Sequence, residues 1–221
     1  IKSLGAEDLR NFHRDYIRPD NVEILVAGDT TLAEITAELD RVFGNWDAAE
    51  MPIPKKSVAD VDAQKTARVF LIDRPDSPQT LILTGALAPS TRTPNNLDIQ
   101  TMNDVFGGNF TSRLNMNLRE DKRWAYGASS FLQDAIGQRP FITYASVQTD
   151  KSAESVHEIL KESRAIIGTR PVTDEELARA KAQSIRALPG SFETTRSVLG
   201  VLVGNALYTR ADDYVTTLKA K

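Results

Sequence analysis

Apolar residues recur at helical spacing in several separated stretches of the chain. In residues 5–17, Leu9, Phe12 and Tyr16 lie three or four positions apart and fall on one face of a helix. The same spacing returns in six further ranges, at 31–43, 94–106, 112–121, 150–167, 174–187 and 191–208. We therefore predict a helix over each of these ranges.

Glycines and a polar motif mark several of the helix ends. We expect Gly44 to close the second helix in a left-handed conformation, and Gly107 to end the third. Residues 173–176 read "TDEE", in which the Thr173 hydroxyl can accept from a helix amide while Glu176 reaches back. This is a capping box, so the sixth helix begins there.

Apolar runs of strand length lie between these helices. Their sequences are "VEILVAG" (22–28), "ARVFLID" (67–73), "QTLILTGAL" (79–87), "AYGASSFLQD" (125–134) and "FITYASVQT" (141–149). Residues 47–65 lose all periodicity and contain Pro52 and Pro54, which is typical of an extended linker. After the linker, paired strands and paired helices alternate, and this order predicts an α+β fold with a mixed, mainly antiparallel sheet covered by helices.

Composition excludes several classes of protein. The 221 residues are 41% hydrophobic and 26% charged, which is ordinary for a globular chain. The formal net charge of −3 favours neither a nucleic-acid groove nor an anionic membrane surface. The sequence contains no run of 18 apolar residues, the length that a membrane-spanning helix needs. The absence of Cys excludes disulfides and thiolate metal ligands.

The chain offers few residues for a catalytic centre of its own. His13 and His157 are its two histidines, and neither belongs to H-E-x-x-H or H-x-x-E-H, the helical spacings that bring two imidazoles to one zinc ion. Both are expected to be ordinary surface residues. The sequence also lacks G-x-S-x-G, G-x-G-x-x-G and G-x-x-x-x-G-K-[ST]. We therefore predict no metal ion and no cofactor bound by this chain.

One junction carries a candidate site. In "NLREDKRWAYGASS" (117–130), Arg119 and Tyr126 lie seven residues apart, where a predicted helix gives way to a predicted strand. Because a guanidinium and a phenol both donate hydrogen bonds, one interpretation of this pair is a functional site. The alternative is structural: Arg119 would pair with a carboxylate and Tyr126 would pack within a hairpin. The spacing alone favours this structural alternative.

Four segments resemble one family of enzymes. "DVFGGNFTSRLNMNLREDKRWAYGASS" is similar to a stretch of the pitrilysin, insulin-degrading-enzyme and mitochondrial-processing-peptidase family of zinc metallopeptidases, in which Gly-Gly, Ser-Arg-Leu and a helix precede an Arg, six residues and a Tyr. "LGAEDLRNFHRDYIRPDNVEILVAGD" resembles the closing helix-turn-strand of its domains, and "RPDSPQTLILTGALAP" resembles the opening hairpin. "LPGSFETTRSVLGVLVGNALY" resembles a late helix. The chain is thus identified as the inactive, non-zinc domain of that family.

The resemblance also implies a division of the chain. Residues 1–48 correspond to the closing unit of a preceding homologous domain, 49–65 to the linker, and 66–221 to the Arg…Tyr domain without its own closing unit. Since the sequence opens at Ile1 without Met, we expect a segment of a longer protein. Residues 1–48 then either take the place of the missing unit or exchange with a second molecule in a swapped homodimer.

The function implied by the resemblance is peptide hydrolysis shared between two domains. Zinc belongs to an H-x-x-E-H domain of the same or another chain, and this chain is expected to be inactive alone. Tyr126 would donate to the scissile carbonyl or oxyanion, and Arg119 would hold the substrate backbone. The resemblance favours the periplasm over the cytoplasm, as many bacterial relatives are exported.

Two departures and two alternatives accompany this prediction. Trp124 stands where the family has a smaller aliphatic residue, and we expect it to pack in the core. The long glycine-rich insertion of the non-catalytic processing-peptidase subunit is absent, which disfavours presequence binding. The first alternative is a purely structural relative of the kind found in respiratory complexes, against which the presence of both Arg119 and Tyr126 argues. The second is an unrelated α+β ligand-binding module.

Overall fold

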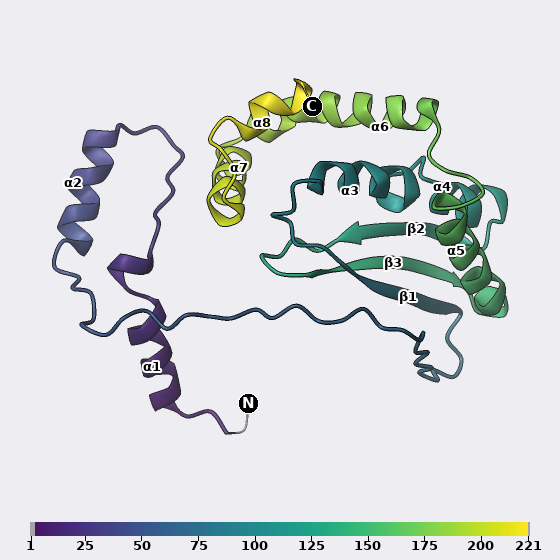
Figure 1. Ribbon diagram of the computed structural model, residues 1–221, viewed down its shortest axis with the longest axis horizontal. Coiled ribbons are helices and arrows are strands. Elements are labelled where there is room, and N and C mark those ends of the chain that lie inside the picture. The colour runs from purple at the N-terminus through teal and green to yellow at the C-terminus, as the bar shows by residue number, and fades with distance from the viewer. Residues whose placement is uncertain (1–2, 221) are drawn as a thin grey trace. The chain divides into compact units, whose positions relative to one another are not determined.

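The computed structural model describes residues 3–220 and divides into two compact units (Figure 1). One unit comprises residues 1–58 and 190–204, and the other comprises 59–189 and 205–221. The first unit holds α1 (Ala6–Tyr16), α2 (Leu32–Phe43) and the first part of α7 (Thr195–Tyr208). Each unit is described by itself.

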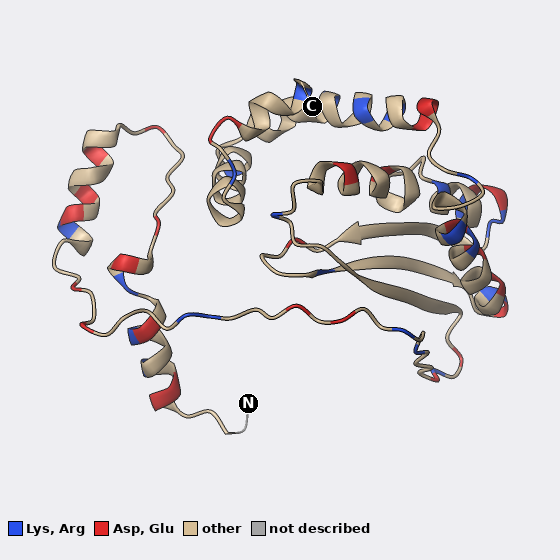
Figure 2. Cartoon of the chain, in the orientation of Figure 1, with Lys and Arg blue, Asp and Glu red and all other residues tan. Residues whose placement is uncertain are grey.

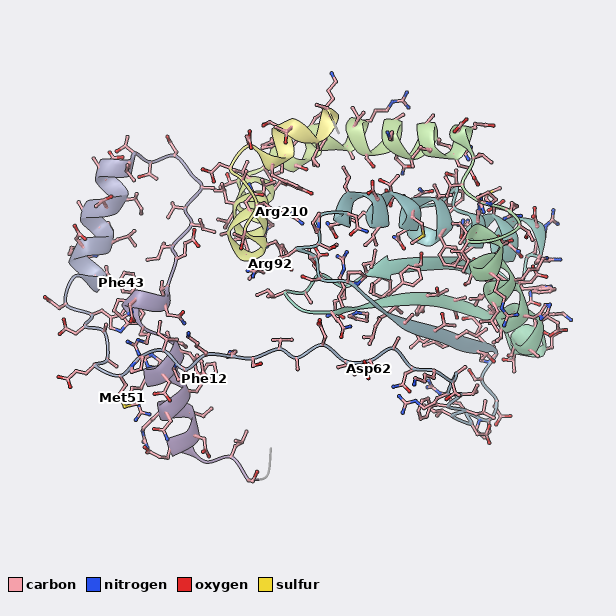
Figure 3. The ribbon with its side chains drawn as sticks, in the orientation of Figure 1. Phe12, Phe43, Met51, Asp62, Arg92 and Arg210 are labelled. Carbon is pink, nitrogen blue, oxygen red and sulfur yellow. The ribbon has the colours of Figure 1, made fainter. Side chains whose placement is uncertain are left out.

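In the first unit, the buried Arg18 guanidinium holds two segments together. Its Nε and Nη2 atoms donate to the Asp20 carboxylate at 2.6 and 2.7 Å. Its guanidinium also donates to the carbonyls of Ala49 and Met51 at 2.8 and 2.7 Å. Figure 3 labels Met51 in this unit, together with Phe12 of α1 and Phe43 of α2. Because a planar guanidinium can serve several acceptors at once, the Arg18 side chain fixes residues 49–51 beside the turn that follows α1.

The second unit is built on a three-stranded antiparallel sheet. Its strands are β1 (Gln79–Ala88), β2 (Ala125–Leu132) and β3 (Arg139–Gln148), in the order β1-β3-β2. The last three of the predicted strands are therefore confirmed. The antiparallel sheet with its covering helices also confirms the predicted α+β fold.

The same unit holds five helices among its described residues: α3 (Asn96–Asn103), α4 (Arg113–Asn115), α5 (Ser152–Ile166), α6 (Asp174–Ala187) and α8 (Tyr214–Thr217). Of these, α3, α4 and α5 pack against the sheet, and α6 packs on α3. Two of them continue as π-helical segments: α3 through Asp104–Gly108 and α4 through Met116–Asp121. Figure 1 shows α3 running alongside the strands with α6 beyond it. The helices at 150–167, 174–187 and 191–208 are confirmed, and the capping box of Thr173 and Glu176 is present.

The two faces of the sheet differ in their exposure, because successive side chains of a strand point to opposite sides. One face packs on the helices and buries Ile82, Ala128, Ser130, Thr143, Ala145 and Val147. The other, which we call the open face, carries Leu81, Leu83, Leu87, Phe131 and Tyr144, each 41–62% exposed. Figure 2 shows that the three strands carry almost no charge. The open face is thus apolar and accessible within this unit.

Gly107 allows the first π-helical segment to lie directly against β2. A Cβ atom on this residue would lie 2.4 Å from the Ser130 hydroxyl and 2.6 Å from the Ser130 amide nitrogen. Such distances require the strand or the helix to move. The helix ends one residue later than predicted, at Gly108, and Asn109 is extended.

Two predicted strands are wrong. Residues 22–28 and 67–73 form no strand, and Val69 and Leu71 are 89% and 92% exposed. An apolar run forms a strand only when the backbone groups of another strand pair with its own. The sequence of the run does not show whether such a strand lies beside it. Gly44 is also not left-handed: its φ is −60°, and its amide makes an ordinary helical bond to the Asp40 carbonyl at 2.8 Å.

Arg139, at the start of β3, is a fully buried charged residue. Its guanidinium donates to the Pro89 carbonyl at 2.9 Å, the Thr91 hydroxyl at 3.0 Å and the Asp134 carboxylate at 2.7 Å. A fourth bond, of 2.5 Å, reaches the Asn96 side chain. One side chain therefore ties the β2–β3 turn to the loop that enters α3.

A third buried arginine, Arg113, joins α4 to α6. Arg113 makes a bidentate ion pair with Glu176, in which its Nε and Nη2 atoms lie 2.7 and 2.6 Å from the two carboxylate oxygens. It also donates to the Pro171 carbonyl at 2.9 Å. The Thr173 amide also donates to Glu176, at 2.9 Å. Hydrogen bonding from Arg113 is the main reason that the pKa of Glu176 falls to about 2, since these bonds favour the charged carboxylate.

This ion pair predicts a loss of stability in acid. A carboxylate with a lowered pKa stabilises the fold above its unfolded pKa, near 4.5, and loses that contribution as pH falls toward 2. We expect Glu176→Gln to lower the free energy of unfolding at pH 7 by about 1–3 kcal/mol and to flatten its pH dependence between about 4.5 and 2. Denaturant unfolding across that range measures both. Glu175→Gln, on the same turn but exposed, is the control, and an equal effect there would contradict the assignment.

Candidate functional site

Arg119 lies in the π-helical segment Met116–Asp121, near the junction with β2. Its guanidinium carbon sits 4.6 Å from the centre of the Phe110 ring, and its Nε is 3.3 Å from the Glu120 carboxylate. The side chains of Arg119 and Glu120 are 39% and 42% exposed. Because solvent screens such a pair, it contributes only about 0–1 kcal/mol to stability. Most of the guanidinium's donors remain available to another molecule.

The chain turns sharply between Arg119 and β2. The Lys122 amide bonds to the Asn117 carbonyl at 2.9 Å, closing a wide helical turn, and the Trp124 amide bonds to the Leu118 carbonyl at 3.0 Å. Arg123 has a φ of 57°, a left-handed conformation that costs a non-glycine residue about 1–3 kcal/mol. Wide helical turns and such strained residues both occur frequently at functional sites. Here they fix the exit from helix to strand.

A β-bulge places Tyr126 on the open face of the sheet. Ala125 pairs with Val147 and Ala128 with Ala145, so Tyr126 and Gly127 together stand opposite the single residue Ser146. Without the extra residue, the two-residue period of β2 would point Tyr126 toward the helices, as it points Ala128. With it, the phenol turns outward, and Tyr126 is 87% exposed. Of the structural alternative, one part is therefore present and one is not: Arg119 pairs with a carboxylate, that of Glu120, but Tyr126 does not pack within the hairpin.

Arg119 and Tyr126 are connected through Asn115 rather than by direct contact. Among residues 3–220, no hydrogen bond or ion pair joins the two side chains. The buried Asn115 amide donates to the Phe110 carbonyl at 2.7 Å, and its oxygen accepts from the Ala128 amide at 3.2 Å. The Asn115 side chain thus contacts two segments. One is the loop of Phe110, whose ring lies against Arg119, and the other is β2 at Ala128, immediately after the bulge. Phe110 and Asn115 were not predicted from the sequence, although an isolated aromatic residue shortly after Gly-Gly was a usable signal for Phe110.

The other predicted residues lie where expected. Trp124 is partly buried and packs against the core, as predicted. His13 and His157 are both exposed, on α1 and α5.

No group of three His, Cys, Asp or Glu side chains in the described part of the chain is arranged to hold a metal ion. The residues present therefore do not fit a zinc site. Over residues 3–220, no helix combines the length and apolar character needed to cross a membrane.

A large polar groove lies elsewhere in the same unit. It measures about 570 Å³ and is lined by charged residues of the α4, α5 and α6 region, and neither Arg119 nor Tyr126 lines it. Two of its carboxylates, Glu158 and Glu162, accept from the Asn117 amide at 2.8 and 2.9 Å. These bonds, with Asn117 the largest influence, lower the pKa of Glu158.

The structure defines a class of protein, an α+β domain with an antiparallel sheet covered by helices and, among its described residues, no group of metal-ligating side chains. A family model for the peptidase M16 inactive domain matches residues 3–184, and the chain belongs to that family. An uncharacterized zinc protease of Bacillus subtilis, YmxG, is 25% identical over 197 residues, which are 89% of this chain and 46% of the relative.

Solved structures share the fold. A peptidase M16 inactive domain from Pseudomonas fluorescens superimposes with a TM-score of 0.85 at 21% identity, over 100% of this chain and 52% of that one. The first half of the periplasmic protease PqqL from Escherichia coli gives 0.74 at 14% identity, over 99% and 48%. The chain spans less than half the length of the curated relatives that it matches, because each match covers 40–46% of the relative.

Proposed function

We propose that this chain is the non-zinc, substrate-contacting half of a zinc metalloendopeptidase. The observation that carries the proposal is the bulge at Tyr126, which exposes a phenol on the open face of the sheet while most of its neighbours there are apolar. Membership of the family supplies the reaction class. Zinc would be held by an H-x-x-E-H domain of the same or another chain, and there it would activate the attacking water.

The chain's own residues act on the peptide. Attack on a peptide bond places negative charge on the former carbonyl oxygen, and a donor aimed at that oxygen stabilises the transition state more than the ground state. Tyr126 supplies such a donor from an exposed position. Arg119 stays charged and presents several donors, so it binds the carbonyls of the extended substrate beside the scissile bond.

The division of labour between two halves can be tested by reconstitution. Cleavage of an unstructured peptide is measured with this chain alone, with the H-x-x-E-H polypeptide alone and with both together, at equal zinc; if one polypeptide carries both, the two halves are expressed separately. We expect cleavage only from the mixture. If the zinc-bearing half is fully active alone, this chain has a purely structural role and no part in proteolysis.

The remaining features of the assembly follow the same proposal. The first half of PqqL shares this fold and is described as periplasmic. We extend that location to this chain. Residues 1–48 would act as the closing unit of the preceding domain, and an exchange of this unit between two molecules would give a swapped homodimer.

A further inference from the structure

We infer that Asn115 is a positioning residue that holds Phe110, and through it Arg119, in a fixed relation to Tyr126. The inference rests on the proposed function, since it gives the two substrate-contacting side chains a shared support. Asn115 itself is 4% exposed and does not reach the substrate.

The first contact fixes the Arg119 side. The Asn115 amide nitrogen donates to the Phe110 carbonyl at 2.7 Å. Phe110 is 59% exposed, and its ring lies 4.6 Å from the Arg119 guanidinium carbon. A guanidinium over an aromatic face keeps its in-plane donors free, so the stack orients Arg119 without using the groups that bind substrate. Asn109 stiffens the same loop, because its side chain bonds both the Thr111 amide and the Asp104 carbonyl, at 3.0 and 2.8 Å.

The second contact fixes the Tyr126 side. The Asn115 side-chain oxygen accepts from the Ala128 amide at 3.2 Å. Ala128 is the first residue after the bulge whose pairing with β3 is regular, and β2 is an edge strand of the sheet. An edge strand has one row of backbone groups without a strand partner, so a side chain that caps one of them limits slippage of the register. The register decides on which face Tyr126 lies.

Both contacts use one amide group, and they can be separated by substitution. Asn115→Asp keeps the oxygen that accepts from Ala128 but replaces the donor with a second oxygen facing the Phe110 carbonyl. Asn115→Leu has a similar volume and removes both bonds. A matched control is Asn103, an equally buried amide that accepts from the Ser130 hydroxyl on the same strand at 2.7 Å and does not touch Phe110.

The experiment is a steady-state comparison in the active enzyme, the full gene product or the reconstituted pair. We expect Asn115→Asp to raise KM with little change in kcat, because only the support of Arg119 is lost. We expect Asn115→Leu to lower kcat as well, by up to about 10²-fold, which is what a displacement near 1 Å costs an oriented group. Asn103→Leu should keep the kcat of the wild type. In a Tyr126→Phe background, Asn115→Leu should lower kcat no further, since the group that it positions is already absent.

The outcomes separate this inference from the proposed function. If Tyr126→Phe lowers kcat and the Asn115 variants behave like Asn103→Leu, the positioning role is overturned and the proposed function stands. If Tyr126→Phe leaves kcat unchanged, the proposed function is wrong and the inference falls with it. Should Asn115→Leu fail to fold, Asn115→Asp decides, and an unchanged KM in that variant overturns the inference.

Discussion

Replacing Tyr126 with phenylalanine is expected to lower kcat for peptide cleavage by about 10²–10³-fold while KM stays nearly constant. The change removes one hydroxyl from a side chain that is 87% exposed. Its hydroxyl makes no hydrogen bond to any residue between 3 and 220, so the fold should be unaffected. The loss would therefore report on an interaction that forms only in the transition state.

Tyr144 provides a matched control for this substitution. It lies on β3, faces the same open side of the sheet and is 41% exposed, but it stands outside the bulge. Tyr144→Phe should leave kcat and KM at their wild-type values. An equal loss in both variants, or no loss at Tyr126, would remove Tyr126 from the chemistry.

Replacing Arg139 with methionine should give the largest loss of stability, a fall in the free energy of unfolding of about 3–5 kcal/mol. Methionine fills much of the volume but removes the donor that serves four acceptors, among them the side-chain oxygen of Asn96, which is itself buried. A buried acceptor that loses its partner costs about 1–3 kcal/mol. Denaturant unfolding with an unchanged m-value would measure the loss.

Arg179→Met is the control for Arg139. Arg179 belongs to the same unit, but its side chain is 51% exposed and lies 3.9 Å from Glu175, so its loss should cost no more than about 1 kcal/mol. Arg139 lies seven residues along β3 from Ser146, roughly 20 Å from the bulge. The Arg139 variant should therefore keep its kcat once it is folded, and a selective loss of kcat would contradict a purely structural role.

The elements of the second unit were largely predictable from local pattern. Helical spacing located α5 and α6, and apolar runs located β1, β2 and β3. The failures at 22–28 and 67–73 have one cause, since pairing depends on a partner that a single run does not reveal. Gly107 was correctly placed near a helix end, but its contact with Ser130, twenty-three residues later in the chain, is tertiary and leaves no local trace.

The site was predictable in its residues and not in its geometry. Resemblance located Arg119 and Tyr126, whereas the bulge that turns Tyr126 outward depends on the pairing of β2 with β3. Asn115 is a polar residue between the fully buried Leu114 and Leu118, and a helical pattern treats it as a minor irregularity. Its importance comes from two hydrogen bonds to distant backbone, which no spacing rule can supply.

The exposed run at residues 69–72, "VFLI", has a consequence for the behaviour of the molecule in concentrated solution. Four consecutive apolar residues of high β-propensity, 78–92% exposed, have the composition that pairs between chains and starts aggregation. Arg68 and Asp73 flank the run, and the Arg68 guanidinium lies 5.6 Å from the centre of the Phe70 ring. Charges at the ends of such a run act as gatekeepers against self-association, so we expect Arg68 and Asp73 to oppose pairing of this run between molecules.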